Sequence, residues 1–164
     1  EEANIDLFRS VVDVNLNSCF LLSALAAQDM LSRQEGSIIN IASVHGLVAS
    51  APNLQPAYAA SKAGLINLTR DLAVQWAKQG VRVNAICPGF VETPHQMNFM
   101  NDPKIRKELE DLHLMGILQP EDIAEFALFL ASDKSRMITG AIHAVDSGYT
   151  AFKGKMELFD QIIS

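Results

Sequence analysis

Hydrophobic positions along the chain switch between helical spacing and short continuous runs. From Ile5 to about Arg33, apolar residues recur mostly at steps of three and four, which predicts one long helix. Because this segment is apolar over much of its circumference, we expect it to be buried on two sides. The turn at residues 34–36 ends the helix, and Gly36 is expected to be its left-handed cap.

Three runs of mostly apolar residues are bounded by turn signals and predict strands of the kind that is covered on both faces, namely Ser37 to Ser43, Val81 to Cys87 and Ile138 to Val145. Helical spacing lies between the strands, from about Ala57 to Lys78 and from Pro120 to about Ser132. Gly80 ends the first of these two helices, and a proline at an early helical position opens the second.

This alternation of helices and strands favours right-handed crossovers in an α/β fold. We therefore expect a single Rossmann-like domain over residues 1–164, with a parallel sheet and helices on both faces. Three strands alone leave a long sheet edge that another strand should cover. The chain also opens directly on a helix, so we expect an N-terminal portion to be missing or supplied by something else.

Two segments fall outside the alternation. Residues 90–118 contain methionines and are punctuated by Pro94, Pro103 and Gly116, which predicts a mobile flap with a short helix near Lys104 to Leu112. Residues 151–164 form a tail whose apolar positions could pack as a short helix on a neighbouring subunit, namely Met156, Leu158, Phe159, Ile162 and Ile163.

The composition is that of a globular protein, with 49% hydrophobic and 20% charged residues. A net charge of −6 argues against a nucleic-acid partner, which requires a basic face. We expect no membrane partner, because no window approaches about 18 uninterrupted apolar residues. Cys19 and Cys87 lie in apolar stretches and are expected to be buried thiols in a reducing cytoplasm. The spacing of histidines and cysteines predicts no metal site.

Candidate chemistry begins with a phenol and an ammonium on one helix face, at Tyr58 and Lys62. A phenol is a poor base at neutral pH, and a nearby cation stabilises its phenolate form. Taken alone, such a pair is often an exposed pair of neighbours without function. Ser43 and the Pro88-Gly89 turn change this, because both close strands at the sheet edge where ligands bind in open parallel sheets.

Each of these residues also has a purely structural interpretation. A serine at a strand end commonly caps a turn, and Pro-Gly is an ordinary turn sequence. Asn15 lies within the first helix, where asparagine is unfavourable. It is either a satisfied polar residue in a helix seam or a kink that holds a water for proton relay.

Taken together, these segments resemble the short-chain dehydrogenase/reductase family. The resemblance is carried by five motifs in the same order as in the family, at residues 13–16, 38–43, 58–64, 82–93 and 140–148. It covers nearly everything from Ile5 to Tyr149. Five motifs in the right order are far more specific than any one of them.

The resemblance implies hydride transfer between NAD(H) or NADP(H) and an alcohol or a carbonyl compound. Tyr58 would be the acid/base, and Ser43 would bind and orient the substrate oxygen. Lys62 would favour the phenolate and hold the nicotinamide ribose. Asn15 would fix a water that links Lys62 to solvent.

The resemblance also implies which residues surround the reacting atoms. Residues expected to line the nicotinamide are Pro88, Gly89, Val91 and Thr93, and residues 90–118 would be the substrate lid. Candidates for substrate contact are His45, Phe90, His95, Met97 and Phe99, although the lid positions are equally expected as lid core and His45 as a plain loop histidine. Subunits of the family pair through two long helices, so a homodimer or homotetramer through residues 5–33 and 57–78 is implied.

The chain departs from the family pattern in several places. The glycine-rich turn that receives the pyrophosphate does not occur in it, nor does the residue that selects NAD or NADP. Ser147 stands where glycine is frequent. Two alternatives therefore stay open: a non-catalytic oligomerisation module or pseudoenzyme, and cofactor-free acid/base chemistry by Tyr58 and Lys62, such as a dehydration.

Overall fold

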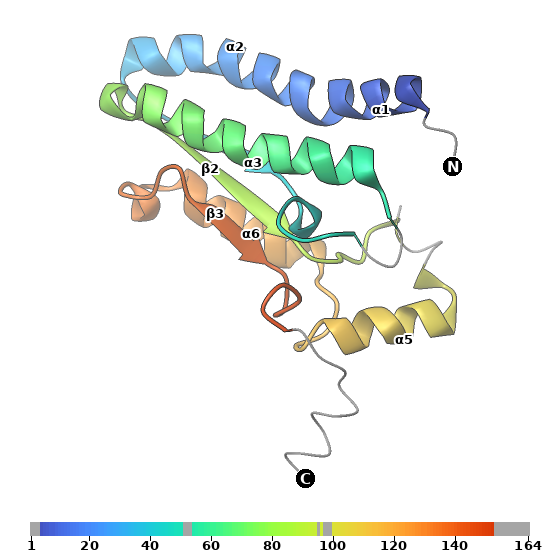
Figure 1. Ribbon diagram of the computed structural model, residues 1–164. Helices are drawn as coiled ribbons and strands as arrows, with labels where there is room; N and C mark the ends of the chain where they lie inside the picture. Colours follow the sequence, from blue (N-terminus) through green and yellow to red (C-terminus); the bar gives the residue numbers. More distant parts are fainter. Residues whose placement is uncertain (1–3, 51–53, 95, 97–99, 153–164) are drawn as a thin grey trace.

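The computed structural model describes residues 4–50, 54–94, 96 and 100–152, which form a parallel sheet with helices on both faces (Figure 1). The sheet has the order β1-β2-β3, with β1 at Gly36–Ile41, β2 at Val81–Pro88 and β3 at Ile142–Val145. Helices α2 (Ser18–Arg33) and α3 (Pro56–Trp76) cover one face, and α6 (Pro120–Ala131) covers the other. The predicted fold class is confirmed.

The first helix runs from Ile5 to Arg33 as predicted, with one break in its regularity. Helix α1 (Ile5–Val12) continues through a π-helical turn at Asp13–Asn17 into α2. In this turn the N–H of Ser18 donates to the carbonyl of Asp13, five residues back. Such turns occur mostly as single insertions in α-helices, frequently at functional sites. This one carries Asn15.

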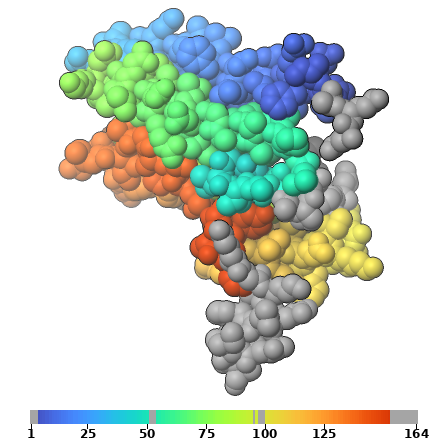
Figure 2. All heavy atoms as spheres, viewed as in Figure 1, coloured from blue at the N-terminus to red at the C-terminus, as the bar shows by residue number. Residues whose placement is uncertain are grey.

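The prediction that this helix is buried on two sides is wrong. Its buried residues within α2 are Ser23 and Ala27. Large apolar side chains face solvent instead, namely Leu7, Val14, Phe20, Leu21, Leu22 and Leu25. The reason is that one face packs on α3 and the sheet, whereas nothing in the described residues covers the other, which forms the upper edge of Figure 2.

Residues Ile5–Arg33 are, by length and composition alone, apolar enough to cross a membrane. Core helices of soluble proteins and signal sequences pass the same test.

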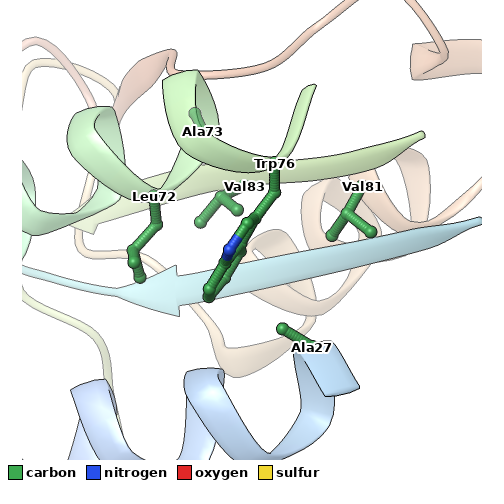
Figure 3. Packing of buried hydrophobic residues seen from close by; sticks show 6 residues of the cluster. All are labelled: Ala27, Leu72, Ala73, Trp76, Val81 and Val83. Carbon is green, nitrogen blue, oxygen red and sulfur yellow. The ribbon is translucent and has the colours of Figure 1, made fainter. Parts of the chain in front are cut away.

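The core beneath this helix joins α2, α3 and β2 (Figure 3). Its buried residues are Ala27, Leu72, Ala73, Trp76, Val81 and Val83. The indole of Trp76 lies between Leu72 and Val81 in this cluster. Helix α3 contributes Trp76 to this core and also carries Tyr58 near its start. The packing therefore helps to position Tyr58 relative to the sheet.

Gln34, rather than Gly36, ends the first helix in the left-handed conformation, with φ 55°. Gly36 is the first residue of β1, and glycine is needed there for a different reason. A Cβ at this position would lie 2.5 Å from the sulfur of Met30, so the strand could not approach α2 as closely as it does. Gly36 is therefore not a helix cap but the residue at which β1 closely approaches α2.

The last strand is shorter than predicted, since β3 begins at Ile142 rather than at Ile138. A turn with positive φ at Gly140 interrupts the extended backbone. The Asn84 side chain binds this segment from both sides, donating to the carbonyl of Ile138 (2.9 Å) and accepting from the N–H of Ala141 (3.1 Å). The Asn84 amide thus makes hydrogen bonds to the backbone of Ile138 and Ala141, in place of the backbone hydrogen bonds that a longer β3 would make there.

Helix α5 (Pro103–Leu112) forms within residues 90–118 as predicted, and lies apart from the main layers, beyond the carboxyl ends of the strands (Figure 1). Helix α6 opens at Pro120 and carries a capping box formed by Gln119 and Asp122. The predicted tail helix, with Met156, Leu158, Phe159, Ile162 and Ile163, lies outside the described residues.

Candidate functional site

A cavity of about 750 Å³ opens at the carboxyl ends of the strands, between the strand ends and α5. Most of the predicted site residues line it, namely Ser43, His45, Tyr58, Gly89, Phe90, Val91 and Thr93. Pro88 is the last residue of β2 and does not line the cavity itself. The predictions for His95, Met97 and Phe99 lie outside the described residues.

Ser43 is positioned where β1 leaves the sheet. Its Oγ accepts a hydrogen bond from the N–H of His45 (3.1 Å) and so caps the short helical turn Val44–Gly46. The turn-capping interpretation is therefore correct, and the same side chain also lines the cavity. Since the Oγ is the acceptor in this bond, its own hydrogen is available for a ligand.

Tyr58 and Lys62 lie one turn apart on α3. The Lys62 Nζ lies 5.7 Å from the centre of the Tyr58 ring and donates to the carbonyl oxygen of Ile41 (2.9 Å). Burial lowers the pKa of Lys62. Because Ile41 is the last residue of β1, the same strand end orients both the lysine and Ser43.

Asn15 connects the π-helical turn to α3. Its Nδ2 donates to the Oγ of Ser61 (3.2 Å), and that hydroxyl donates to the carbonyl of Tyr58 (2.7 Å). Asn15 is thus a bonded polar residue in the helix seam, as its structural interpretation held. The bond also reaches the helical turn that carries Tyr58 and Lys62, so the position is consistent with the functional interpretation as well.

The turn after β2 forms one wall of the cavity and is hydrogen-bonded to the segment around Leu118. Val91 forms a parallel bridge with Leu118, where the N–H of Leu118 donates to the carbonyl of Phe90 (3.1 Å). The N–H of Glu92 in turn donates to the carbonyl of Leu118 (2.8 Å). These bonds join the two ends of the segment expected to be the lid.

His113, which was not predicted from the sequence, lies behind the cavity wall and contacts two of its residues, Phe90 and Leu109. It is 1% exposed. Its Nε2 accepts from the N–H of Phe90 (3.0 Å), and its Nδ1 lies 2.7 Å from the carbonyl of Leu109. A main-chain donor on one side and an acceptor on the other fix the neutral tautomer that carries its hydrogen on Nδ1. Burial lowers the pKa of His113, in agreement with this.

The imidazole of His113 also leaves no room at Gly89. A Cβ at that position would lie 2.8 Å from Nε2. On its other side, the imidazole lies 5.1 Å from the ring of Tyr149, measured between ring centres. His113 therefore packs the cavity wall between α5 and the turn after β2.

His45 lies among the aromatic rings of the cavity wall. Its ring centre is 6.2 Å from that of Tyr58, 5.9 Å from that of Phe90 and 6.5 Å from that of Tyr149, in edge-on arrangements. Its Nε2 is buried and has no hydrogen-bond partner among the described residues. Burial lowers the pKa of His45, so its neutral form is favoured.

Charged residues fasten α5 to the turn after β2. The Nη1 of Arg106 lies 3.0 Å from Oε1 of Glu92, and its Nε lies 2.9 Å from Oε1 of Glu110. Gln119 donates to the other oxygen of Glu92 (3.0 Å). The hydrogen bonds from Gln119 and Arg106 hold the pKa of Glu92 below its ordinary value. Glu92, which lies between Val91 and Thr93, is thus bound directly to α5, the helix of the expected lid.

Ser147 adopts the left-handed conformation, with φ 53°, which explains why glycine suits this position. Its Oγ accepts from the N–H of Met115 (2.7 Å), and its carbonyl accepts from the N–H of Leu114 (2.8 Å). The serine therefore binds the end of the lid segment to the turn after β3.

Comparison with known proteins agrees with this arrangement. Residues 1–150 match a family described as enoyl-(acyl carrier protein) reductase. Galactitol 2-dehydrogenase of Rhizobium johnstonii is 40% identical over 143 residues, which are 87% of this chain and 56% of that protein. A structure of a 4-hydroxyisoleucine dehydrogenase mutant complexed with NADH and succinate has a TM-score of 0.85 and 38% identity, over 91% of this chain and 61% of the other.

An Agrobacterium tumefaciens protein with bound NADP is also similar, with a TM-score of 0.83 and 35% identity over 93% of this chain and 61% of the other. The chain belongs to the short-chain dehydrogenase/reductase family, and the resemblance that its motifs carry is confirmed. Its Rossmann-like architecture is confirmed as well. The chain spans just over half the length of the curated relative, 56%.

Proposed function

We propose that the full-length protein is an NAD- or NADP-dependent oxidoreductase that interconverts an alcohol and a ketone or aldehyde, with Tyr58 as the acid/base. The observation that carries this proposal is the convergence of three groups. Ser43 and Tyr58 line one cavity, and the ammonium of Lys62 lies 5.7 Å from the Tyr58 ring. Family membership and the similar proteins complexed with NADH or NADP support the cofactor class.

The cavity wall fits the nicotinamide part of such a cofactor. Val91 offers an apolar surface, and Thr93, two residues on, offers a hydroxyl for the carboxamide. Gly89 lines the same wall, and Lys62 would reach the ribose hydroxyls from beside Tyr58. When bound, the nicotinamide supplies the two-electron acceptor or donor.

The protein's own residues bind the substrate oxygen and move its proton. In alcohol oxidation, Ser43 donates a hydrogen bond to the substrate oxygen and holds it beside Tyr58. The phenolate of Tyr58 takes the hydroxyl proton, and Lys62 stabilises the phenolate. In carbonyl reduction, Tyr58 returns the proton to the same oxygen. Asn15 would hold a water through which Lys62 exchanges protons with solvent.

Replacing Tyr58→Phe in the full-length protein removes the phenol oxygen and keeps the ring. We expect turnover to fall by roughly a hundredfold or more, on the scale of losing a general acid/base, while NADH or NADPH still binds. Tyr149→Phe is the matched control, because Tyr149 also lines the cavity and has no role in the proton transfer. Turnover of Tyr58→Phe within about tenfold of the wild type would contradict the assignment.

The exposed face of the first helix supports a homodimer or homotetramer built through residues 5–33 and 57–78. Leu22 and Leu25 on α2, and Val74 on α3, are exposed apolar side chains of the kind that subunit contacts cover. Sedimentation velocity of the full-length protein tests this, and a monomer at micromolar concentration would contradict it. We further expect a cytoplasmic protein with a small-molecule substrate and neither nucleic acid nor membrane as partner.

The same apolar face favours a second candidate, a non-catalytic oligomerisation module. Titration of the full-length protein with NADH and NADPH, followed by fluorescence, separates the two candidates. Micromolar binding supports the oxidoreductase. An unchanged signal at millimolar nucleotide supports the oligomerisation module.

A further inference from the structure

The lid helix α5 presents one charge to the cavity. Four of its residues line the cavity and recur at helical spacing, so that they share one face: Ile105, Glu108, Leu109 and Leu112. Three of them are apolar. Glu108 is therefore a carboxylate on an otherwise apolar stripe, facing the compartment that contains Ser43 and Tyr58.

Glu108 forms no ion pair within α5, and the exposed Lys104, one turn before it, is not bonded to it. The ion pairs of this helix involve other residues, with Arg106 bound to Glu92 and Glu110, and Lys107 bound to Asp111. Within residues 4–50, 54–94, 96 and 100–152, no hydrogen bond or ion pair reaches the Glu108 carboxylate. It is exposed at the rim of the cavity.

The described cavity wall supplies no compensating cation. Its other side chains are apolar or neutral polar groups, and none of its described residues is lysine or arginine. His45 is held toward its neutral form, because burial lowers its pKa. Lys62 does not line the cavity, and its ammonium donates to the carbonyl of Ile41. A ligand that reaches the cavity face of α5 thus meets one unpaired carboxylate, that of Glu108.

We infer that the cavity takes alcohols or carbonyl compounds whose end remote from the reacting carbon bears a hydroxyl or ammonium group, and that Glu108 discriminates against a carboxylate at that end. This rests on the proposed function, because the reacting carbon is placed between Ser43 and Tyr58. A donor at the remote end would hydrogen-bond to Glu108, whereas a carboxylate would meet a like charge. Since water screens an exposed carboxylate, we expect a preference of about tenfold.

Three compounds that differ at one end test the inference: 1,5-hexanediol, 6-amino-2-hexanol and 5-hydroxyhexanoate. Each carries the same secondary alcohol, four carbons from a hydroxymethyl, an aminomethyl or a carboxylate group. With the full-length protein and its preferred nucleotide, kcat/KM is measured for each, and binding is measured in parallel by saturation-transfer NMR. We expect the diol and the amine to exceed the acid by about tenfold in both readouts.

Glu108→Gln should bring the three compounds within about threefold of one another. Glu125→Gln, which removes the same charge from an exposed position of α6 outside the cavity, should keep the preference. Equal use of the acid by the wild type, an unchanged preference in Glu108→Gln, or no binding of any compound would overturn the inference. Selective binding without turnover would instead leave the inference standing and contradict the oxidoreductase function.

Discussion

His113 and Phe90 are joined by a hydrogen bond of 3.0 Å, in which the imidazole of His113 accepts from the main-chain N–H of Phe90. Phe90 belongs to the wall where the nicotinamide is proposed to bind, and His113 follows the last turn of the lid helix α5. The bond requires an unprotonated Nε2. This hydrogen bond between the lid and the wall therefore depends on the protonation state of one buried histidine.

Stability should consequently fall in mild acid. The pKa of His113 is lowered in the folded protein, so its contribution is fully present above the unfolded pKa of about 6.5 and is lost as the pH falls through the folded value. His113→Gln keeps an acceptor that does not protonate. We expect the wild type to be the more stable protein at about pH 7.5, and its advantage to shrink by on the order of 1 kcal/mol at about pH 5.

Urea unfolding of both proteins at the two pH values measures this difference. His45 and His143, whose pKa values are also lowered by burial, are present in both proteins and cancel in the comparison. An advantage that is constant or larger at the lower pH would show that His113 is not held neutral.

The ion pair between Arg106 and Glu92 should control how well the lid closes rather than the chemistry. Glu92→Gln weakens the link between α5 and the turn carrying Val91 and Thr93. We expect KM to rise about three- to fivefold with kcat within about twofold, because a partly exposed pair contributes modestly. High salt, near 1 M, should raise the wild-type KM in the same direction by screening.

Asp111→Asn is the control for the Arg106–Glu92 ion pair. It removes the Lys107–Asp111 pair, which joins two residues of α5 and does not reach the turn. Its KM should stay at the wild-type value. A fall in kcat without a change in KM for Glu92→Gln would mean that the pair acts on the reacting atoms instead.

Ser147 combines an unfavourable backbone conformation with a useful hydrogen bond. Ser147→Ala keeps the left-handed backbone and loses the acceptor for the Met115 N–H, so we expect a loss of about 1 kcal/mol. Ser147→Gly loses the same bond but relieves a strain of similar size, and should stay within about 0.5 kcal/mol of the wild type. The free energy of unfolding in urea should thus rank glycine above alanine, and the reverse order would refute the strain argument.

Regular spacing made most of the fold predictable. Tyr58 and Lys62 are four residues apart on a helix, and Ser43 and Gly89 follow strands that end at the same sheet edge, so their meeting follows from periodicity and topology. The helix start at Pro120 and the helix end at Gly80 follow from local backbone preferences.

The features that escaped prediction depend on particular side-chain contacts. His113 bonds to a main-chain N–H that lies 23 residues away, and a single histidine after a helix gives no local sign of such a partner. Gly36 looked like a cap, yet the side chain of Met30, including its Cβ at 2.7 Å, occupies the space that a Cβ at this position would need. The shortened β3 reflects an amide side chain, Asn84, on the neighbouring strand. Side-chain packing of this kind leaves no periodic pattern in the sequence.

The cooperation of Lys62 with Tyr58 is tested most directly by the pH dependence of kcat/KM for alcohol oxidation, between about pH 6 and pH 10, in the full-length wild type and in Lys62→Met. If the ammonium stabilises the phenolate, its loss should move the acidic limb of the profile to higher pH by about one unit or more, whatever it does to the plateau. A lower plateau with the acidic limb unmoved would contradict the proposed acid/base pair.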